Sequence, residues 1–264
     1  IVFHAAAYKH VSLGEKNQLE FLENNVLGTY HSALMSIKYN CANFTLVSTD
    51  KAVRPSNIMG ASKRFAEIIV QSMYENQNDN KTIFSVVRFG NVIGSSGSVV
   101  PLFQSQINNG GPVTVTHPKV TRYFMTISEA VSLILLSSTI AKGAEVFVLE
   151  MGEPIKIESL AEKLISLSGK TPVKNKDHLK PDEIKIDYIG LKPGEKLHEE
   201  LIIGKNILRS KYQDILIAKE EFISWVELEK FLEEIKESIR ENNLHKAIHV
   251  LKEVVEDFKG QTDF

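Results

Sequence analysis

The stretch FTLVSTDKAVRPSNIMGASKRFAEIIVQSMYE, residues 44–75, contains a strand, a polar turn and a long helix in succession. The apolar run from Phe44 to Ser48 predicts the strand, and apolar residues recur at helical spacing from about 57 to 75. Thr49, Asp50 and Lys51 follow the strand directly. Because ligands bind at the carboxyl ends of strands in open α/β sheets, we expect chemistry at these residues.

The same alternation continues on both sides of this stretch. Strands are predicted at 1–6 and 83–88, with a helix at about 16–39 between the first strand and the second. Strands that alternate with long helices predict a parallel sheet with helices on its faces. Beyond Asn91 the pattern changes to glycines and short β-like pieces. The later predictions are helices at about 127–141 and 157–168, strands at 145–149 and 184–188, and two amphipathic tail helices that break at Asn242-Asn243.

Composition sets limits on the class of protein. The 264 residues are 43% hydrophobic and 24% charged, with a net charge of −2. This balance predicts a soluble chain with a real core and gives no electrostatic case for a nucleic-acid partner. The single Cys41 excludes an intramolecular disulfide and fits a reducing compartment. No apolar run approaches the roughly 18 residues of a membrane span.

Three predicted strand ends carry polar groups, in VFHAAAYKHV (2–11), LVSTDKAV (46–53) and VRFGNVIGSSGSVVPLF (87–103). Further motifs are NNVLGT (24–29), MGASKR (59–64), TRYFMTISEA (121–130) and LKPGEKLHEEL (191–201). In this order they resemble the polysaccharide-biosynthesis group of nucleotide-sugar 4,6-dehydratases, in the extended branch of the short-chain dehydrogenase/reductase superfamily. The likeness is greatest to bacterial UDP-N-acetylglucosamine 4,6-dehydratases of capsule, O-antigen and protein-glycosylation pathways, and it covers about residues 1–220.

The resemblance implies a Rossmann-like, doubly wound parallel sheet with a smaller C-terminal substrate-binding α/β region and a helical tail. We expect residues 1–90 to be the remaining part of an NAD(P)-binding Rossmann domain, 91–218 to be mainly substrate-binding with some segments returning to the sheet, and 219–264 to be the helical tail. The Gly-rich phosphate loop of the first βαβ unit is not in this sequence, nor is the residue that selects NAD or NADP. We therefore expect about 80 or more upstream residues of that domain to be missing, and this stretch alone to be inactive.

Met59 and Lys63 stand four residues apart, so they lie on one face of a helix. In the superfamily this spacing is Tyr-x-x-x-Lys, where the phenol moves a proton. A thioether has no proton to give. Taken alone, the pair is a core methionine and a surface lysine; in the family that the motifs resemble, a methionine at this position is usual in the larger, membrane-anchored members. The proton chemistry then falls to Thr49, Asp50 and Lys51.

The resemblance assigns roles at the site. The catalytic set is Thr49, Asp50, Lys51, Met59 and Lys63, with Asp50 as the acid at O6 of the sugar, Lys51 as the base at C5, and Thr49 near O4. An ordinary turn ion pair is the alternative for Asp50 and Lys51. Residues expected at the NAD or NADP cofactor are Ala5, Ala6, Ala7, Asn25, Ser48, Lys63, Arg88 and Gly90. Those expected at the UDP-sugar are Lys9, Asn91, Val99, Val100, Pro101, Leu102, Phe103, Arg122, Lys192 and Glu195. The family's Arg-Pro-Gly-Glu begins here with Lys192, which keeps the charge but loses the bidentate fork.

The implied reaction oxidises C4, eliminates water across C5–C6 and returns hydride to C6. Alternatives are a C5-inverting dehydratase, a nucleotide-sugar epimerase and, from another class, a non-catalytic nucleotide-binding regulator. The Asp50-Lys51 pair argues against the epimerase and the regulator, which are not expected to carry it. Met59 argues against the C5-inverting dehydratase and the epimerase, which usually have Tyr at this position. No metal is expected, although His245 and His249 share a helix face. We expect a homo-oligomer in the cytoplasm, at the inner face of the membrane if the full-length protein is anchored.

Overall fold

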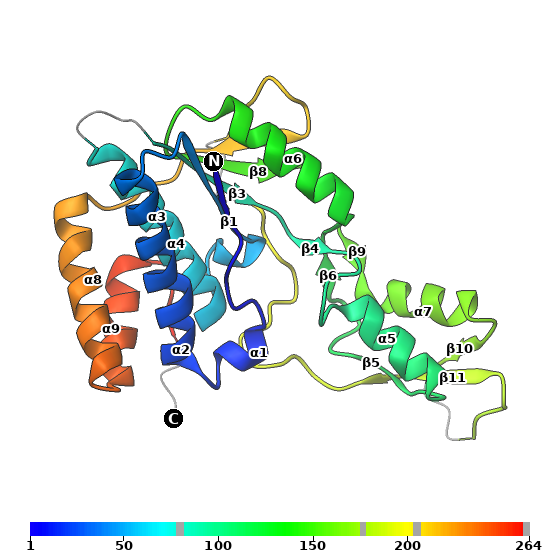
Figure 1. The fold of residues 1–264 in the computed structure, drawn as a ribbon. Helices are drawn as coiled ribbons and strands as arrows, with labels where there is room; N and C mark the ends of the chain where they lie inside the picture. Colours follow the sequence, from blue (N-terminus) through cyan, green and yellow to red (C-terminus); the bar gives the residue numbers. More distant parts are fainter. Residues whose placement is uncertain (78–81, 175–177, 203–206, 261–264) are drawn as a thin grey trace. The chain divides into compact units, whose positions relative to one another are not determined.

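A six-stranded sheet, in the order β1-β2-β3-β8-β13-β12, lies at the centre of the first of two units (Figure 1). The computed structural model describes residues 1–77, 82–174, 178–202 and 207–260. Its first unit comprises residues 1–89, 131–150 and 200–264, and the second comprises 90–130 and 151–199. The chain is therefore an α/β protein that crosses between two units more than once.

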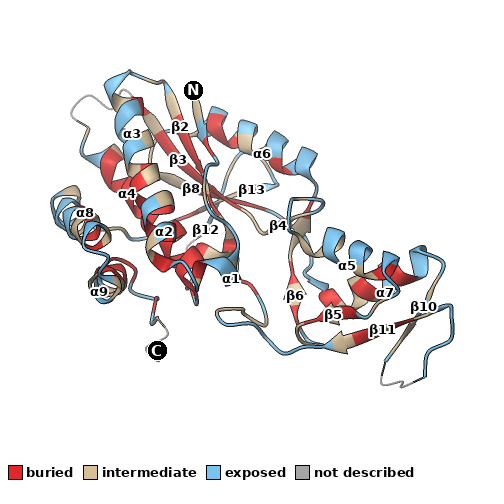
Figure 2. Cartoon of the chain, turned by 60° about the horizontal axis from the view of Figure 1, so that its bottom comes forward, coloured by how far each residue is buried: buried red, intermediate tan, exposed pale blue. Residues whose placement is uncertain are grey.

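Four neighbouring strands of the large sheet are parallel: β1 (Val2–His4), β2 (Asn43–Val47), β3 (Ile83–Arg88) and β8 (Glu145–Leu149). β13 (Ile215–Ala218) and β12 (Ile207–Arg209) add an antiparallel edge. The inner strands are buried along almost their whole length, which suits a parallel sheet that is covered on both faces (Figure 2). This confirms the predicted Rossmann-like sheet.

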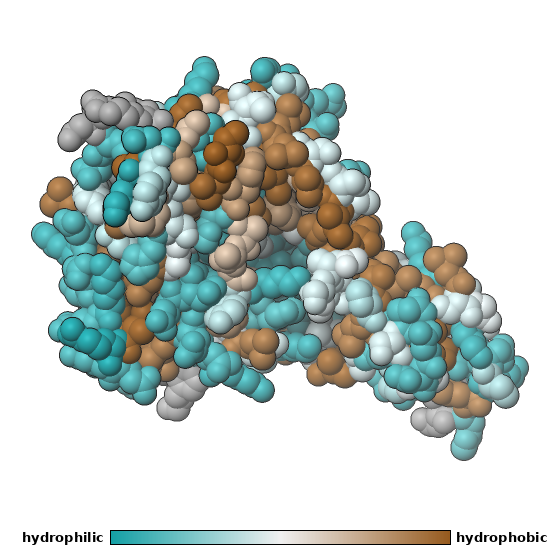
Figure 3. Space-filling model, viewed as in Figure 1, coloured by the Kyte–Doolittle hydropathy of each residue, from teal (hydrophilic) through white to brown (hydrophobic). Residues whose placement is uncertain are grey.

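Helices cover both faces of this sheet. α3 (Gly28–Lys38) and α4 (Ile58–Glu75) lie on one face, and α6 (Ile127–Ile140) lies on the other (Figures 1 and 2). Nearly every residue of α4 is buried, because the helix contacts β3, α3 and the tail helices. α6 is apolar on several sides and leaves Ile127, Val131 and Leu135 about half exposed. Figure 3 shows an apolar surface on the side of the molecule where this helix lies.

The helix expected at about 16–39 is instead a chain of segments. After α1 (Val11–Gly14) come α2 (Gln18–Leu22), a π-helical turn η1 (Glu23–Leu27) and then α3. The π turn inserts a residue that no apolar periodicity marks, so the pattern could not locate it. η1 holds Asn25 in the buried interior.

The tail helices α8 (Trp225–Arg240) and α9 (Leu244–Val254) confirm the sequence prediction, with their break at Asn242-Asn243. Asn242 has a positive φ of 52°, and the Asn243 side chain caps α9 by accepting from the Lys246 amide at 3.1 Å. The apolar faces of α8 and α9 pack against each other and against α4. The tail is thus part of the first unit's core.

The second unit has its own core around a three-stranded parallel sheet, β10-β11-β5. Its strands are β10 (Thr171–Val173), β11 (Glu183–Tyr188) and β5 (Val113–Val115), and helices α5 (Val99–Asn108) and α7 (Ile157–Leu167) pack on them. Two small ladders complete it, β4 (Asn91–Val92) with β7 (Phe124–Met125) and β6 (Thr121–Arg122) with β9 (Ile155–Lys156). The sequence analysis did not predict the helix α5. Its Pro101 is compatible with a helix because it lies in the first turn, where a backbone N–H is not needed for an intrahelical bond.

Candidate active site

Thr49, Asp50 and Lys51 follow β2 and form one hydrogen-bonded group at its carboxyl end. Thr49 caps the short 3₁₀ helix η2 (Asp50–Ala52), and its hydroxyl donates to Asp50 Oδ1 at 2.9 Å. Lys51 Nζ donates to the same oxygen at 2.9 Å. The Asp50 amide donates to the Phe89 carbonyl at 3.0 Å, which ties the turn to the end of β3. The three residues that the sequence singled out are therefore held as a unit.

The second carboxylate oxygen of Asp50 has surroundings that differ from those of the first. Asp50 is fully buried, and its Oδ2 has no hydrogen-bond partner in the part of the chain that the structure describes. A buried carboxylate oxygen without a partner is costly, and in native structures such a group is explained by strain, by a catalytic role or by a bound water or ion. Lys51 keeps 17% of its side chain exposed, so the pair is open on the lysine side.

Helix α4 presents Met59 and Lys63 from one face, and both are buried. Met59 is 3% exposed and belongs to the hydrophobic core. Lys63 is 5% exposed, and its ammonium donates to the Val47 carbonyl at 2.7 Å. Burial lowers the pKa of Lys63 to about 8, against the Glu67 carboxylate, which raises it. The Lys63 ammonium makes this one hydrogen bond among the described residues, so N–H donors remain for a ligand.

A glycine sets the distance between α4 and the Asp50-Lys51 turn. A Cβ on Gly60 would lie 2.2 Å from the Lys51 carbonyl oxygen. The Gly60 amide is also the donor to the capping side chain of Asn57, at 2.8 Å. The first turn of α4 therefore approaches the backbone of Lys51 more closely than any side chain would permit. Sequence reasoning missed this glycine.

The residues expected at the cofactor have varied surroundings. Ala5 and Ala6 are exposed and Ala7 is half-buried, directly after β1. Asn25 accepts from the Tyr8 amide at 2.8 Å and donates to Ser62 Oγ at 2.9 Å, so its side chain joins the loop after β1 to α4. Gly90 is half-buried, and its amide donates to Met151 Sδ within the second unit.

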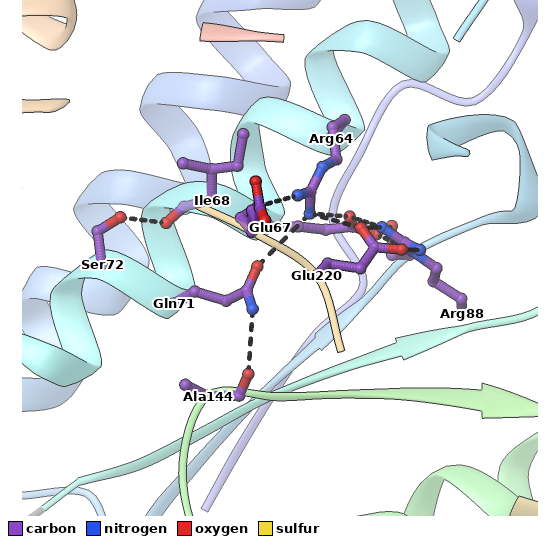
Figure 4. A network of polar contacts seen from close by, with 10 residues as sticks. Arg64, Glu67, Ile68, Gln71, Ser72, Arg88, Ala144 and Glu220 are labelled. Atoms are coloured by element: carbon purple, nitrogen blue, oxygen red, sulfur yellow. Dashed lines mark hydrogen bonds and ion pairs between the residues drawn. The ribbon is translucent and has the colours of Figure 1, made fainter. Parts of the chain in front are cut away.

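Ser48 and Arg88 belong to a buried ion network that sequence reasoning did not foresee (Figure 4). Ser48 Oγ donates to Glu67 Oε1 at 2.6 Å, and Arg88 Nε donates to the same oxygen at 2.7 Å. Arg88 is 0% exposed and also binds Glu220, which follows β13. Arg64 bonds to both glutamates, at 3.1 Å each. The Arg88 guanidinium is thus occupied by two carboxylates.

The ion pairs of this network shift the pKa values of Glu67 and Arg88. Burial acts to raise the pKa of Glu67, but Arg88, with Arg64 and Ser48, overrides it and holds that pKa below its ordinary value. Burial acts to lower the pKa of Arg88, and Glu67 and Glu220 more than reverse that effect. Both groups are therefore charged at neutral pH. Nearby, burial lowers the pKa of His4 to about 4, so its imidazole is neutral.

In the second unit, Arg122 and Glu195 form a pair, with Arg122 Nη2 3.0 Å from Glu195 Oε1. Arg122 also donates to the carbonyls of Thr121, Lys196 and Leu197. Phe103 is packed in this unit's core, while Leu102 is exposed. Of the remaining residues expected at the sugar nucleotide, Lys9, Pro101 and Lys192 are exposed and Asn91, Val99 and Val100 are half-buried.

Neither a metal cluster nor a membrane span is found within the described residues. No group of three or more His, Cys, Asp and Glu side chains there could hold a metal ion. Among the same residues, no helix is both long and apolar enough to cross a bilayer.

Comparison with known proteins identifies the family. The family described as "Polysaccharide biosynthesis protein" matches residues 1–220, and the chain belongs to it. The "Capsular polysaccharide biosynthesis protein CapD" of Staphylococcus aureus is 48% identical over 93% of this chain, but the match covers 39% of CapD. The chain thus spans about two fifths of the length of CapD and of a second relative, the "Probable polysaccharide biosynthesis protein EpsC" of Bacillus subtilis.

Solved structures share the fold. Pen from Bacillus thuringiensis is 34% identical, with a TM-score of 0.72 over 87% of this chain and 74% of Pen. The dTDP-glucose 4,6-dehydratase DesIV from Streptomyces venezuelae, solved with NAD bound, is 18% identical, with a TM-score of 0.63 over 75% of this chain and 63% of DesIV. The second likeness shows the fold alone.

Proposed function

We propose that the full-length protein is a UDP-N-acetylglucosamine 4,6-dehydratase that makes a UDP-4-keto-6-deoxy-hexosamine for capsule, O-antigen or glycoprotein synthesis. The observation that carries this proposal is the buried Asp50, bonded through one oxygen to Thr49 and Lys51 and without a hydrogen-bond partner among the described residues at the other. Membership of the polysaccharide biosynthesis family supports the pathway class.

The elimination needs an acid for O6 and a base for C5, and the pair offers both. After C4 is a ketone, the C5 proton is acidic enough for a neutral lysine to remove. The protonated Asp50 then gives its proton to the departing O6 hydroxyl, so that water leaves. This step ends with a charged Asp50-Lys51 pair, which the 2.9 Å contact between them stabilises.

Proton balance closes through Thr49. The proton released from O4 during oxidation reaches Asp50 along the Thr49 hydroxyl, which already donates to Oδ1 at 2.9 Å. Asp50 thus carries one proton from O4 to O6 in each cycle. Lys51 returns its proton to C5 when the C5–C6 double bond is reduced. No phenol is required in this scheme, which fits the burial of Met59 in the core.

A bound NAD or NADP supplies the hydride acceptor for C4 and the donor for C6. Lys63 fits such a group, because its buried ammonium has donors left after bonding Val47 and could hold ribose hydroxyls. Ala5, Ala6 and Ala7 have no long side chains to obstruct a cofactor. The fold that this chain shares with NAD-bound DesIV supports a nicotinamide cofactor. In the second unit, Arg122, Lys192 and Glu195 remain our proposed contacts for the UDP-sugar, together with Lys9 and Asn91.

The test is direct. The full-length protein is incubated with UDP-N-acetylglucosamine and NAD or NADP, and the product is identified by NMR, with Asp50→Asn as the matched inactive control. A 4-keto-6-deoxy sugar with C5 unchanged supports the proposal. A C5-inverted product, a C4 epimer that retains the C6 hydroxyl, or no turnover with either cofactor would each overturn it in favour of a named alternative.

A further inference from the structure

Glu67 occupies a place that the proposed reaction has not used. It lies four residues after Lys63 on α4, so the two side chains share one face of the helix. Its carboxylate is fully buried and accepts from Ser48, Arg64 and Arg88. Figure 4 shows Arg64 beside Glu67 on α4, with Arg88 reaching in from the end of β3 and Glu220 from the segment after β13.

Lys63 and Glu67 each make a hydrogen bond from α4 to one of two successive residues at the end of β2. Lys63 Nζ bonds the Val47 carbonyl at 2.7 Å, and Glu67 Oε1 accepts from the hydroxyl of the next residue, Ser48, at 2.6 Å. Thr49 and Asp50 follow immediately. A shift of α4 along β2 would break both hydrogen bonds. The two bonds therefore fix the position of Lys63 relative to the turn that carries Thr49, Asp50 and Lys51.

Arg88 extends the same link to the neighbouring strand. It reaches Glu67 from the last position of β3, and the following residue, Phe89, accepts from the Asp50 amide at 3.0 Å. Glu67 therefore joins the helix that carries Lys63 to both strands that hold the turn. The network carries no net charge, since Arg64 and Arg88 balance Glu67 and Glu220.

We propose that Glu67 is a positioning residue for Lys63: its carboxylate, held by Ser48, Arg64 and Arg88, fixes α4 against the ends of β2 and β3 and places a negative charge one helical turn from the Lys63 ammonium. Because Lys63 is our proposed cofactor ligand, the importance of this role for turnover rests on the proposed function. The electrostatic role itself concerns this chain's own residues and can be measured without a substrate.

The surroundings of Lys63 support an electrostatic role. Burial brings the pKa of Lys63 down to about 8, and Glu67 is the group that opposes this. On β1, His4 also interacts with Lys63, but burial lowers the pKa of His4 to about 4 and leaves it neutral. Arg64 and Arg88 are paired with Glu67 and Glu220, and Glu67 is the charged group of this network that acts on Lys63, so without its charge the effect of burial would be unopposed. The neutral amine would then be favoured at lower pH.

The experiment uses full-length protein labelled with ¹³C at the lysine ε carbon, with Lys63→Met to assign the signal. In Glu67→Gln we expect Lys63 to titrate about one pH unit or more below its wild-type midpoint. The affinity for NAD or NADP, measured by fluorescence, should begin to fall at a correspondingly lower pH than in the wild type. Glu67→Asp, which keeps the charge, should restore the midpoint even if it lowers the melting temperature.

Two controls separate this role from general stability. Glu220→Gln removes the other carboxylate from Arg88, so it should lower the melting temperature but leave the Lys63 midpoint in place. Glu75→Gln makes the same charge change at an exposed position two turns further along α4 and should change neither. An unchanged Lys63 midpoint in Glu67→Gln, or an equal change in Glu220→Gln, would overturn the proposal. If Glu67→Gln does not fold, the Glu67→Asp variant provides the test. A Lys63 midpoint displaced by about one pH unit in that variant, which keeps the negative charge, would also overturn the proposal. The NMR midpoints do not depend on turnover, so a failure of the proposed function would show separately, as absent dehydration by the wild type.

Discussion

Replacement of Gly60 by alanine tests whether close packing of α4 sets the catalytic geometry. The new Cβ would lie 2.2 Å from the Lys51 carbonyl oxygen, 3.0 Å from its carbonyl carbon and 3.2 Å from Pro55 Cβ. An ordinary contact is about 3.5 Å, so the turn or the helix must move by about 1 Å. The obstacle is backbone, which no rotamer change can relieve.

The magnitude follows from two opposing effects. Overpacking of this kind costs typically about 1–3 kcal/mol. Alanine recovers up to about 1 kcal/mol through its higher helix propensity. We therefore expect Gly60→Ala to be destabilised by about 1–2 kcal/mol, a fall of about 3–6 °C in melting temperature. A 1 Å displacement of Lys51 relative to Lys63 should lower kcat by about a hundredfold.

Gly28→Ala is the matched control. Gly28 lies in a helix with φ −59°, and a Cβ there would meet nothing within 4 Å. The same substitution should therefore stabilise the protein, by up to about 1 kcal/mol. Thermal unfolding of the full-length variants and kcat with UDP-N-acetylglucosamine are the measurements. If Gly60→Ala proves as stable as Gly28→Ala and keeps wild-type kcat, the packing argument is wrong.

Three further predictions concern the site. Lys51→Ala should abolish elimination but allow transient reduction of the nicotinamide, seen by absorbance; solvent-deuterium exchange at C5 at the wild-type rate would contradict its role as base. Asp50→Asn should lower kcat by about a hundred- to ten-thousandfold, whereas Met59→Leu should stay within about tenfold, because Met59 is 3% exposed and packs in the core. Met59→Tyr should bring no gain, and equal losses in Met59→Leu and Asp50→Asn would reveal a chemical role for the sulfur. Since the pKa of Lys63 falls from 10.5 to about 8 on folding, the unfolded chain binds more protons between these values, and stability rises with pH there. Without cofactor, wild type should gain up to about 3 kcal/mol relative to Lys63→Met between pH 8 and 10.5 in urea unfolding; a constant difference would show an ordinary lysine.

The order of strands and helices could be predicted because it depends on short-range periodicity. The strand at 44–48 and the helix at 57–75 match β2 and α4 closely, since a buried strand and a long amphipathic helix leave distinct apolar patterns. The grouping of Thr49, Asp50 and Lys51 was equally accessible, because neighbours in sequence are neighbours in space. The shared face of Met59 and Lys63 followed from helix geometry alone.

Partners distant in the sequence were decided by the tertiary structure. Arg88 and Glu220 are 132 residues apart, and nothing in either segment identifies the other. Nor does the sequence say that Gly60 meets the Lys51 carbonyl, or that one oxygen of Asp50 is buried without a bond in the described structure. The physical reason is that charge pairing and close packing depend on which surfaces the sheet brings together. The sequence therefore determined which residues could act, and the packing of α4 on β2 and β3 determined which of them are held in place by others.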